Sequence, residues 1–221
     1  MNALSARDGY RLWAPHYATE TAVSWLENHA VAALGVATAG RRLLDVGCGT
    51  ARRLRNADAA IAVGVDLTPE MLGHASAGHA LAAADVLSLP FAAALFDVVW
   101  CRLTIGHVRD LAAAYAELSR VCSMGGAVVV SDLCSEAIAA GHRRTFRDST
   151  GALHEVEHFV HTFERHAGAA RNVGLELERR QDGVVGPDIR RFYAEAGRLA
   201  AYEEQRGMRL VVALSFRKQA A

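Results

Sequence analysis

The sequence predicts an α/β protein built on a doubly wound, parallel sheet. Over the first 133 of its 221 residues, short apolar runs alternate with segments of helical periodicity, and this alternation is typical of parallel βαβ units. The runs are apolar at every position, as expected of strands that are buried on both faces. With 52% hydrophobic residues, the chain is long enough for one large domain with a buried core.

Helices and strands follow in order along this half of the chain. An amphipathic helix is predicted first, because apolar residues recur at helical spacing over residues 21–36. Thr68 can cap a later helix with Pro69 at its first position, where the missing N–H costs nothing. The predicted strands are the apolar runs 43–46, 60–65, 81–84, 96–101 and 127–130, and the predicted helices between them cover 69–77 and 111–121, with Gly125 and Gly126 forming the turn after the second of these.

The second half of the chain gives weaker signals. We expect a hairpin around residues 149–151, a helix over 163–173 and strands at 175–178 and 210–216. Residues 184–207 interrupt the hairpin expected between the last two strands. This segment is either a helical cover over a binding pocket or an ordinary packing helix.

Charge and composition exclude several functions. The 24 Lys and Arg residues are balanced by 24 Asp and Glu residues, which argues against a nucleic-acid partner, because such proteins usually carry a basic surface. Lys218 is the only lysine, so a Walker A phosphate loop, a lysine Schiff base and a Tyr-Lys dehydrogenase pair are excluded. A small-molecule ligand is the better expectation.

The cysteines and the apolar runs bear on location. Cys48, Cys101, Cys122 and Cys134 form no C-x-x-C pair, and three of them lie in or beside apolar runs, which indicates a reducing compartment. Residues 1–10 include no apolar signal region, and no run approaches the roughly 18 apolar residues of a membrane span. We therefore expect a cytoplasmic protein without a membrane partner, either a monomer or a homodimer.

Acidic residues stand at the ends of three successive predicted strands. The first strand ends in Asp45-x-Gly47-x-Gly49 and is expected to open onto a helix, so that bare backbone and a helix N-terminus face a ligand. Asp66 ends the second strand, where a carboxylate can accept hydrogen bonds from two ribose hydroxyls, and Asp85 ends the third. Together they predict a site for a nucleoside with a ribose diol and an exocyclic adenine amine.

These segments also carry a family resemblance. The chain resembles the class I S-adenosylmethionine-dependent methyltransferases, and within them the small-molecule branch that includes ubiquinone and menaquinone biosynthesis enzymes. The resemblance covers most of residues 10–133. It lies in LLDVGCGT (43–50), GVDLTPEML (64–72), ADVLSLPF (84–91), FDVVW (96–100), His107-Val108 and MGGAVVV (124–130). The sequence departs from the family's motifs at two positions: Ala51 stands where many members have a third glycine, and Met124 stands where a proline is usual.

The resemblance implies a fold, an activity and a set of site residues. The fold would be a Rossmann-like sheet of seven strands, mostly parallel with an antiparallel last strand. The activity would be transfer of a methyl group from S-adenosyl-L-methionine to O or N of a small molecule. The glycine loop would lie against the methionine part, Asp66 would hold the ribose, and Asp85 the adenine amine. The residues expected to bind the cofactor are Tyr10, Trp13 and Tyr17 of a lid segment, with Asp45, Gly47, Cys48, Gly49, Asp66, Leu67, Met71, Asp85, Val86 and Cys101.

We expect a single domain over residues 1–221. Residues 1–40 would form lid helices, 41–133 the cofactor-binding half, and 134–221 the acceptor-side half, with insertions at 134–161 and 184–207. Two other interpretations stay open. One is a non-catalytic module that binds S-adenosylmethionine for interaction or regulation. The other is an NAD-dependent oxidoreductase, which fits worse because Arg52 stands where helix and strand should pack closely on a third glycine.

His107 is the candidate general base, because it follows the fourth predicted strand beside the point where ligands bind in such sheets. The alternative is that it only packs in the loop. Arg147, His154 and His158, from an insertion rich in arginine and histidine, are candidate acceptor-binding residues, and the pair Arg190-Arg191 could also hold an anionic acceptor. His154 and His158 would share one face of a strand, whereas His161 would face away unless the strand has ended, so we expect no metal site from these histidines.

Overall fold

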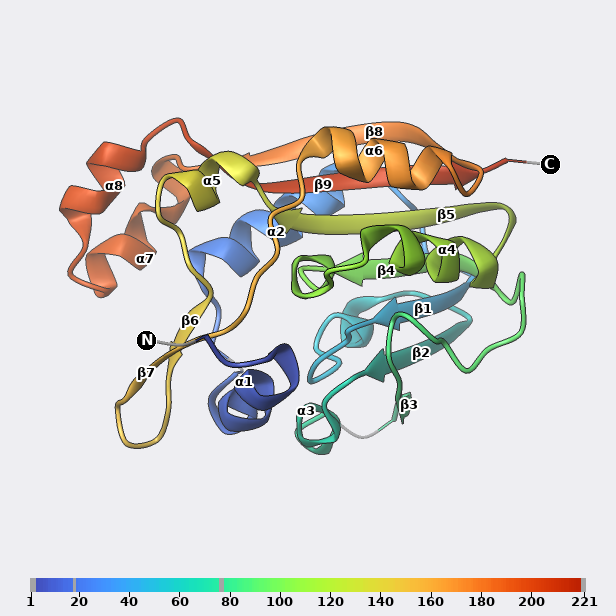
Figure 1. The fold of residues 1–221 in the computed structure, drawn as a ribbon, viewed down its shortest axis with the longest axis horizontal. Coiled ribbons are helices and arrows are strands. Elements are labelled where there is room, and N and C mark those ends of the chain that lie inside the picture. Colours follow the sequence, from blue (N-terminus) through green and yellow to red (C-terminus); the bar gives the residue numbers. More distant parts are fainter. Residues whose placement is uncertain (1–2, 18, 76–77, 220–221) are drawn as a thin grey trace.

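The computed structural model describes residues 3–17, 19–75 and 78–219. Its centre is a seven-stranded sheet in the order β3-β2-β1-β4-β5-β9-β8 (Figure 1). The neighbours from β3 to β5 pair in parallel, whereas β9 is antiparallel to both β5 and β8. The predicted mostly parallel sheet with an antiparallel last strand is therefore confirmed. The strands are β1 Arg42–Val46, β2 Ile61–Asp66, β3 Ala80–Ala83, β4 Phe96–Arg102, β5 Cys122–Leu133, β8 Leu175–Val184 and β9 Arg209–Lys218.

Helices cover both faces of this sheet. α2 (Ala22–Ala33) begins with a capping box between Thr21 and Ser24 and contacts β5, β8 and β9. α4 (Leu111–Val121) contacts β4 and β5, and α6 (Phe163–Arg171) contacts α4 and β8; Figure 1 shows α4 and α6 in front of the sheet. Alternate residues of the strands face the two layers, which is why the runs are apolar at every position.

The smaller elements lie at the carboxyl end of the strands and at the side of the sheet. α1 (Ala6–Trp13) contacts α3 (Pro69–Gly73) (Figure 1). The predicted hairpin around 149–151 is present as β6 (Thr145–Arg147) and β7 (Leu153–Glu155). The remaining helices are α5 (Ser135–Ala139), α7 (Arg190–Glu195) and α8 (Leu199–Gln205). Among the described residues, no helix has the length and apolar character needed to cross a membrane.

Three local predictions were wrong. The glycine loop does not open onto an α-helix: of the fourteen residues between β1 and β2, only the short 3-10 turn Leu54–Asn56 is helical. The turn predicted at Gly125-Gly126 lies within β5, where the register against β4 shifts and the additional residues bulge. α3 ends at Gly73 rather than at residue 77, and residues 76–77 lie outside the described part of the chain.

Candidate functional site

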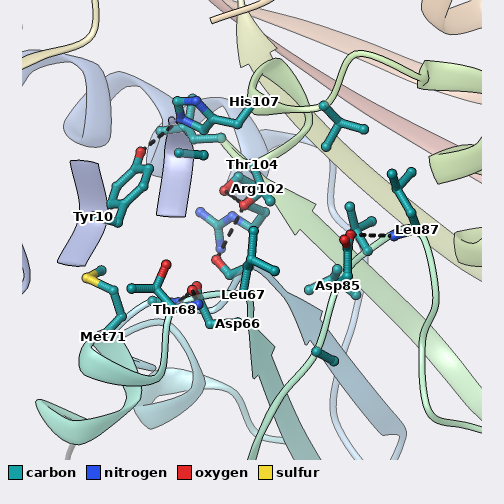
Figure 2. Close-up of a pocket in the computed structure, with 18 of the residues that line it drawn as sticks. Tyr10, Asp66, Leu67, Thr68, Met71, Asp85, Leu87, Arg102, Thr104 and His107 are labelled. Carbon is teal, nitrogen blue, oxygen red and sulfur yellow. Dashed lines mark hydrogen bonds between the residues drawn. The ribbon is translucent and has the colours of Figure 1, made fainter. Parts of the chain in front are cut away.

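A cavity of about 360 Å³ opens at the carboxyl ends of β1, β2 and β4, beneath α1 (Figure 2). This is the switch point of the sheet, where β1 pairs with β2 on one side and β4 on the other. Ten of the residues predicted from sequence line it. They are Tyr10, Tyr17, Gly47, Gly49, Asp66, Leu67, Met71, Asp85, Val86 and His107.

Asp66 holds the glycine loop in place from the end of β2. Its Oδ2 accepts a hydrogen bond from the backbone N–H of Gly49 (2.8 Å), and its Oδ1 accepts one from the N–H of Thr68 (2.8 Å). Burial raises the pKa of Asp66, against the lowering effect of these two donors. The carboxylate is thereby fixed in orientation at the cavity wall, with lone pairs left to accept from a ligand hydroxyl.

The side of the cavity next to β3 combines apolar walls with one carboxylate. Leu67 and Leu87 line the cavity and are each 41% exposed, so both leave apolar surface open to a ligand. Asp85 accepts a hydrogen bond from the N–H of Leu87 through Oδ1 (2.9 Å), as Figure 2 shows. A flat apolar ring with an amino group at its edge suits this arrangement.

Glycine is required in the loop after β1. Gly47 has φ of +73°, and a Cβ there would lie 2.1 Å from Oγ1 of Thr104. Gly49 has φ of +58°, and its Cβ would lie 3.1 Å from Cε of Met71. A side chain at Gly47 would clash outright, whereas one at Gly49 would be strained by its positive φ and would have to displace the end of Met71; bare backbone faces the cavity at both.

Tyr10, His107 and Arg144 form a hydrogen-bonded group on the opposite side of the cavity. Nδ1 of His107 lies 2.6 Å from the carbonyl oxygen of Glu157. Because a carbonyl only accepts, Nδ1 carries the proton and Nε2 is the acceptor in the neutral ring. The Tyr10 hydroxyl therefore donates to Nε2 of His107 (3.0 Å) and accepts from Nε of Arg144 (3.1 Å).

The ionisation of this group follows from its burial. Burial, reinforced by the Arg144 cation, lowers the pKa of His107 to about 4, so the ring is neutral at pH 7. Burial likewise raises the pKa of Tyr10 to about 12, although Arg144 opposes it, so its hydroxyl stays protonated. At pH 7, Nε2 of the neutral His107 ring thus accepts a hydrogen bond from the protonated Tyr10 hydroxyl.

Four predicted cofactor residues lie outside the cavity lining. Asp45 is 0% exposed, and neither carboxylate oxygen has a hydrogen-bond partner among the described residues. Burial raises its pKa to about 6, against the effect of Arg53 and Arg102. Cys48 and Cys101 are buried thiols whose pKa burial raises far above the usual range. Trp13 stacks between Tyr10 (5.6 Å between ring centroids) and Phe146 (4.9 Å).

The three predicted acceptor-binding residues also lie outside the lining. Arg147 is exposed on β6 and donates to the carbonyl oxygen of Gly151. His154 on β7 pairs with Asp148 (2.7 Å), and His158 pairs with Asp132 at the end of β5 (3.2 Å). Their role in acceptor binding stays a prediction.

The pair Arg190-Arg191 and the segment 184–207 also lie outside the cavity lining. Arg191, exposed on α7, pairs with Glu20 (3.4 Å), and no residue of 184–207 lines the cavity. α7 and α8 pack on each other through Tyr193 and Tyr202, which favours the packing interpretation. No group of three metal-ligand side chains occurs within the described ranges.

Several lining residues were missed from sequence. Thr104 lies two residues past the end of β4, and Phe159 lies in the segment after β7. Arg144 does not line the cavity but donates to the lining residue Tyr10; it was one of several arginines in the insertion, and nothing in their spacing distinguished it. Only a comparison of strand ends in space could have identified Thr104, because its contact is with Gly47, 57 residues earlier in the chain.

Comparison with known proteins gives the family of the central segment. Residues 44–130 match the family model described as a methyltransferase domain. A malonyl-[acyl-carrier protein] O-methyltransferase of Erwinia billingiae is 36% identical over 104 residues, which is 45% of this chain and 41% of that protein. A chloroplastic tocopherol O-methyltransferase of Arabidopsis thaliana is 32% identical over 113 residues, 46% of this chain and 32% of that protein. The matched part thus spans less than half of these relatives.

The fold has a close counterpart among solved structures. An S-adenosylmethionine-dependent methyltransferase from Mesorhizobium loti superposes with a TM-score of 0.68 at 23% identity, over 87% of this chain and 97% of that one. At this identity the likeness concerns the fold. The methyltransferase family match covers residues 44–130, and the solved structure shows that the chain as a whole has the same fold.

Proposed function

We propose that this chain, which carries a class I S-adenosylmethionine-dependent methyltransferase domain, transfers a methyl group from S-adenosyl-L-methionine to an oxygen of a small-molecule acceptor. The observation that carries the proposal is one continuous cavity with Asp66 and Asp85 on one side and the Tyr10–His107 pair on the other. The choice of oxygen is supported by the two relatives described above, which are both named as O-methyltransferases.

The residues present fit the cofactor. Asp66 would accept from the ribose hydroxyls, with its carboxylate already oriented by two backbone donors. Leu67 and Val86 would enclose the adenine, and Asp85 would accept from its amine. The bare backbone of Gly47 and Gly49 leaves space for the rest of the molecule. Of the remaining predicted residues, Met71 and Tyr17 line the same cavity, and we propose that they pack against the bound cofactor.

When bound, the cofactor supplies an electrophilic methyl group. The chain's own part is to align the acceptor, exclude water and accept a proton. The lid helix α1 excludes water, because Tyr10 closes one side of the cavity and is fixed there by Arg144 and His107. An acceptor proton would pass to the Tyr10 hydroxyl as that hydroxyl releases its own proton to Nε2 of His107. With its lowered pKa, His107 is a weak base, which suits an acidic acceptor.

The domain organisation, the kind of acceptor and the cellular location are also proposals. We propose a single domain over residues 1–221 whose first 40 residues close over the cofactor, acting on a free or carrier-bound small molecule. The four cysteines are buried and unpaired, which supports a reducing, cytoplasmic location.

The test is calorimetric titration of the purified protein with S-adenosylhomocysteine, S-adenosylmethionine and NADH. We expect both sulfur nucleosides to bind and NADH not to bind. The variant Asp66→Ala should bind them at least tenfold more weakly, because charged hydrogen bonds are worth about 1.5–3 kcal/mol each. Asp58→Ala, at an exposed carboxylate outside the cavity, is the matched control.

Either of two results would refute part of the proposal. Binding of NADH without binding of the sulfur nucleosides would replace the methyltransferase with an oxidoreductase. Binding of S-adenosylmethionine without formation of S-adenosylhomocysteine from a broad acceptor panel would favour the non-catalytic module.

A further inference from the structure

A buried carboxylate lies next to the loop that carries His107. The side chain of Asp132, on β5, is 2% exposed. Its Oδ1 lies 3.2 Å from Nε2 of His158 and accepts a hydrogen bond from the N–H of Leu133 (2.7 Å). Its Oδ2 lies 3.5 Å from Nε2 of His166 on α6. The proton transfer proposed above makes no direct use of this carboxylate.

Asp132 carries a negative charge that no described arginine or lysine neutralises. Burial would raise the pKa of Asp132, but the His158 and His166 imidazoles overcome that effect and lower it to about 2. The carboxyl group is therefore ionised at pH 7. Within the described part of the chain, its ionic partners are these two histidines alone.

The hydrogen bonds around the two histidines fit neutral rings. The hydroxyl of Tyr115 lies 3.0 Å from Nδ1 of His166, and burial raises the pKa of this hydroxyl well above its usual range. The hydroxyl therefore donates to Nδ1, and Nε2 of His166 carries the ring proton that faces Asp132. Nδ1 of His158 is buried without a hydrogen-bond partner among the described residues, so a second proton there would lack an acceptor. Neutral rings leave the negative charge of Asp132 uncompensated.

The Asp132–His158 pair packs directly against the loop after β4. A Cβ at Gly106 would lie 2.2 Å from Nε2 of His158 and 2.6 Å from Oδ1 of Asp132, so a side chain there would clash with the pair. The ring centroids of His107 and His158 are 5.8 Å apart, and the two rings are nearly perpendicular (81°). The pair and His107 thus form one cluster at the ends of β4 and β5.

The segment that contains His158 also fixes the orientation of His107. The carbonyl oxygen of Glu157 accepts the hydrogen bond from Nδ1 of His107 (2.6 Å), and the N–H of Phe159 donates to the backbone of the same loop (2.6 Å). His158 lies between these two contacts, so its hydrogen bond to the buried carboxylate holds the carbonyl group that sets the His107 tautomer.

The proposed proton transfer places a positive charge on His107. Burial and the Arg144 cation oppose this charge most, and His158 adds to their effect, whereas the charge of Asp132 favours it. The carboxylate of Glu157 is turned toward Arg109 (3.9 Å), and the Tyr10 hydroxyl is neutral. A buried charge acts on its neighbours more strongly than an exposed one, because little water screens it.

We propose that Asp132 is the counter-charge for protonated His107 and that His158 holds it against the loop. Asp132 and His158 are positioning residues, since neither lines the cavity. The inference rests on the proposed function for the role of His107 as the base.

The step balances in atoms and charge. The acceptor oxygen bonds to the methyl carbon as the carbon–sulfur bond breaks, and the electron pair of that bond stays on sulfur. The acceptor proton passes to the Tyr10 hydroxyl, whose own proton passes to Nε2 of His107. The positive charge lost at sulfur thus reappears on His107, where Asp132 stabilises it.

The first test measures the pKa of His107 directly and requires no acceptor. Histidine rings labelled with ¹³C are titrated by NMR, and the His107 signal is assigned by its loss in His107→Gln. Asp132→Asn keeps the shape of the side chain and removes its charge. It should lower the pKa of His107 by about half a pH unit or more, because an attractive charge is lost.

The sign of this change separates a role of the charge from a merely structural role. Burial is the main cause of the low pKa of His107. A loosened fold would admit water and raise this pKa toward its ordinary value. A pKa of His107 that is unchanged or raised in Asp132→Asn would therefore overturn the proposal.

A second Asp–His pair provides the matched control. Asp148 pairs with His154 in the β6–β7 hairpin (2.7 Å), and its charge is not among the causes that act on His107. Asp148→Asn should leave the pKa of His107 unchanged. An equal lowering in both variants would show a general effect of net charge and would also count against Asp132.

The wild-type protein supplies a measurement that does not depend on the folding of Asp132→Asn. ¹⁵N NMR at pH 7 should show His158 and His166 as neutral rings with the proton on Nε2. A doubly protonated ring at either position would compensate Asp132 locally, and the proposal would then fail.

Kinetics extend the test to turnover. With an acceptor, Asp132→Asn should lower kcat by roughly three- to tenfold while the Kd for S-adenosylhomocysteine stays within about twofold of wild type. An unchanged kcat would contradict the proposal. Failure of S-adenosylmethionine and S-adenosylhomocysteine to bind the wild-type protein would instead overturn the proposed function and leave the NMR result standing.

Discussion

Glu27 joins three parts of the structure that are distant in sequence. Its side chain, on α2, is 0% exposed. Oε1 accepts from Nε of Arg102 on β4 (2.8 Å) and from the hydroxyl of Ser131 on β5 (2.7 Å). Oε2 accepts from Nη2 of Arg102 (3.0 Å) and from Nη2 of Arg53 (3.1 Å). One carboxylate thus compensates two buried cations.

Replacing Glu27 by glutamine keeps the shape and removes the charge. Burial alone would raise the pKa of Glu27, but Arg53 and Arg102 overcome that effect and lower it from 4.5 to about 2. Since one pKa unit corresponds to about 1.4 kcal/mol, the charged form stabilises the folded state by about 3 kcal/mol. This agrees with the roughly 3–5 kcal/mol lost when one partner of a buried pair is removed. We expect Glu27→Gln to lower the free energy of unfolding at pH 7 by about 3 kcal/mol.

The pH dependence gives a second, independent measure. A carboxyl whose pKa is lowered by folding contributes its full stability above its unfolded pKa, here 4.5, and loses it as the pH falls toward the folded value of about 2. The difference in unfolding free energy between wild type and Glu27→Gln should therefore be constant from pH 7 to about 5. It should shrink as the pH falls from 4.5 toward 2.

Urea denaturation, which leaves the ionic strength unchanged, measures both effects. Glu178→Gln is the matched control, because Glu178 forms a half-exposed pair with Arg217 (2.9 Å); it should cost at most about 1 kcal/mol. A loss below 1 kcal/mol in Glu27→Gln, or a difference from wild type that stays the same at pH 3, would refute the argument from buried charge.

Four further predictions concern the site. Gly47→Ala should lower the free energy of unfolding by at least 1–3 kcal/mol, because its Cβ would meet Thr104 at 2.1 Å and its φ is +73°; a melting temperature within 1 °C of wild type would contradict this. His107→Ala should lower kcat at least tenfold with an unchanged Kd for S-adenosylhomocysteine, and unchanged turnover would remove His107 from the mechanism. The pKa of His107 is about 4, so protonation of its ring should not alter wild-type kcat between pH 6 and 8. This protonation should lower kcat only as the pH drops toward 4. Treatment with EDTA should leave nucleoside binding unchanged, since the described residues offer no three-ligand cluster; a loss restored by a divalent metal would show that a metal site had been overlooked.

Features that depend on near neighbours along the chain could be predicted from the sequence. Apolar runs and helical periodicity record which local faces are buried, so β1 to β4 and α4 were predicted within one residue at each end, whereas β5 begins five residues before the predicted run. Asp66 and Asp85 were found for a related reason. Parallel strands end at a common edge of the sheet, so residues at successive strand ends lie close together without further information.

Contacts between distant segments could not be predicted from the sequence and became clear only in the folded chain. Arg144 and Tyr10 are 134 positions apart, and their meeting depends on how the β6–β7 hairpin packs against α1. Tertiary contacts also decided the tautomer of His107, through Glu157, and the need for glycine at Gly47, through Thr104. A local sequence pattern indicates which face of a segment is buried. It does not indicate which distant segment packs against that face, because this pairing depends on the energy of the whole packed chain.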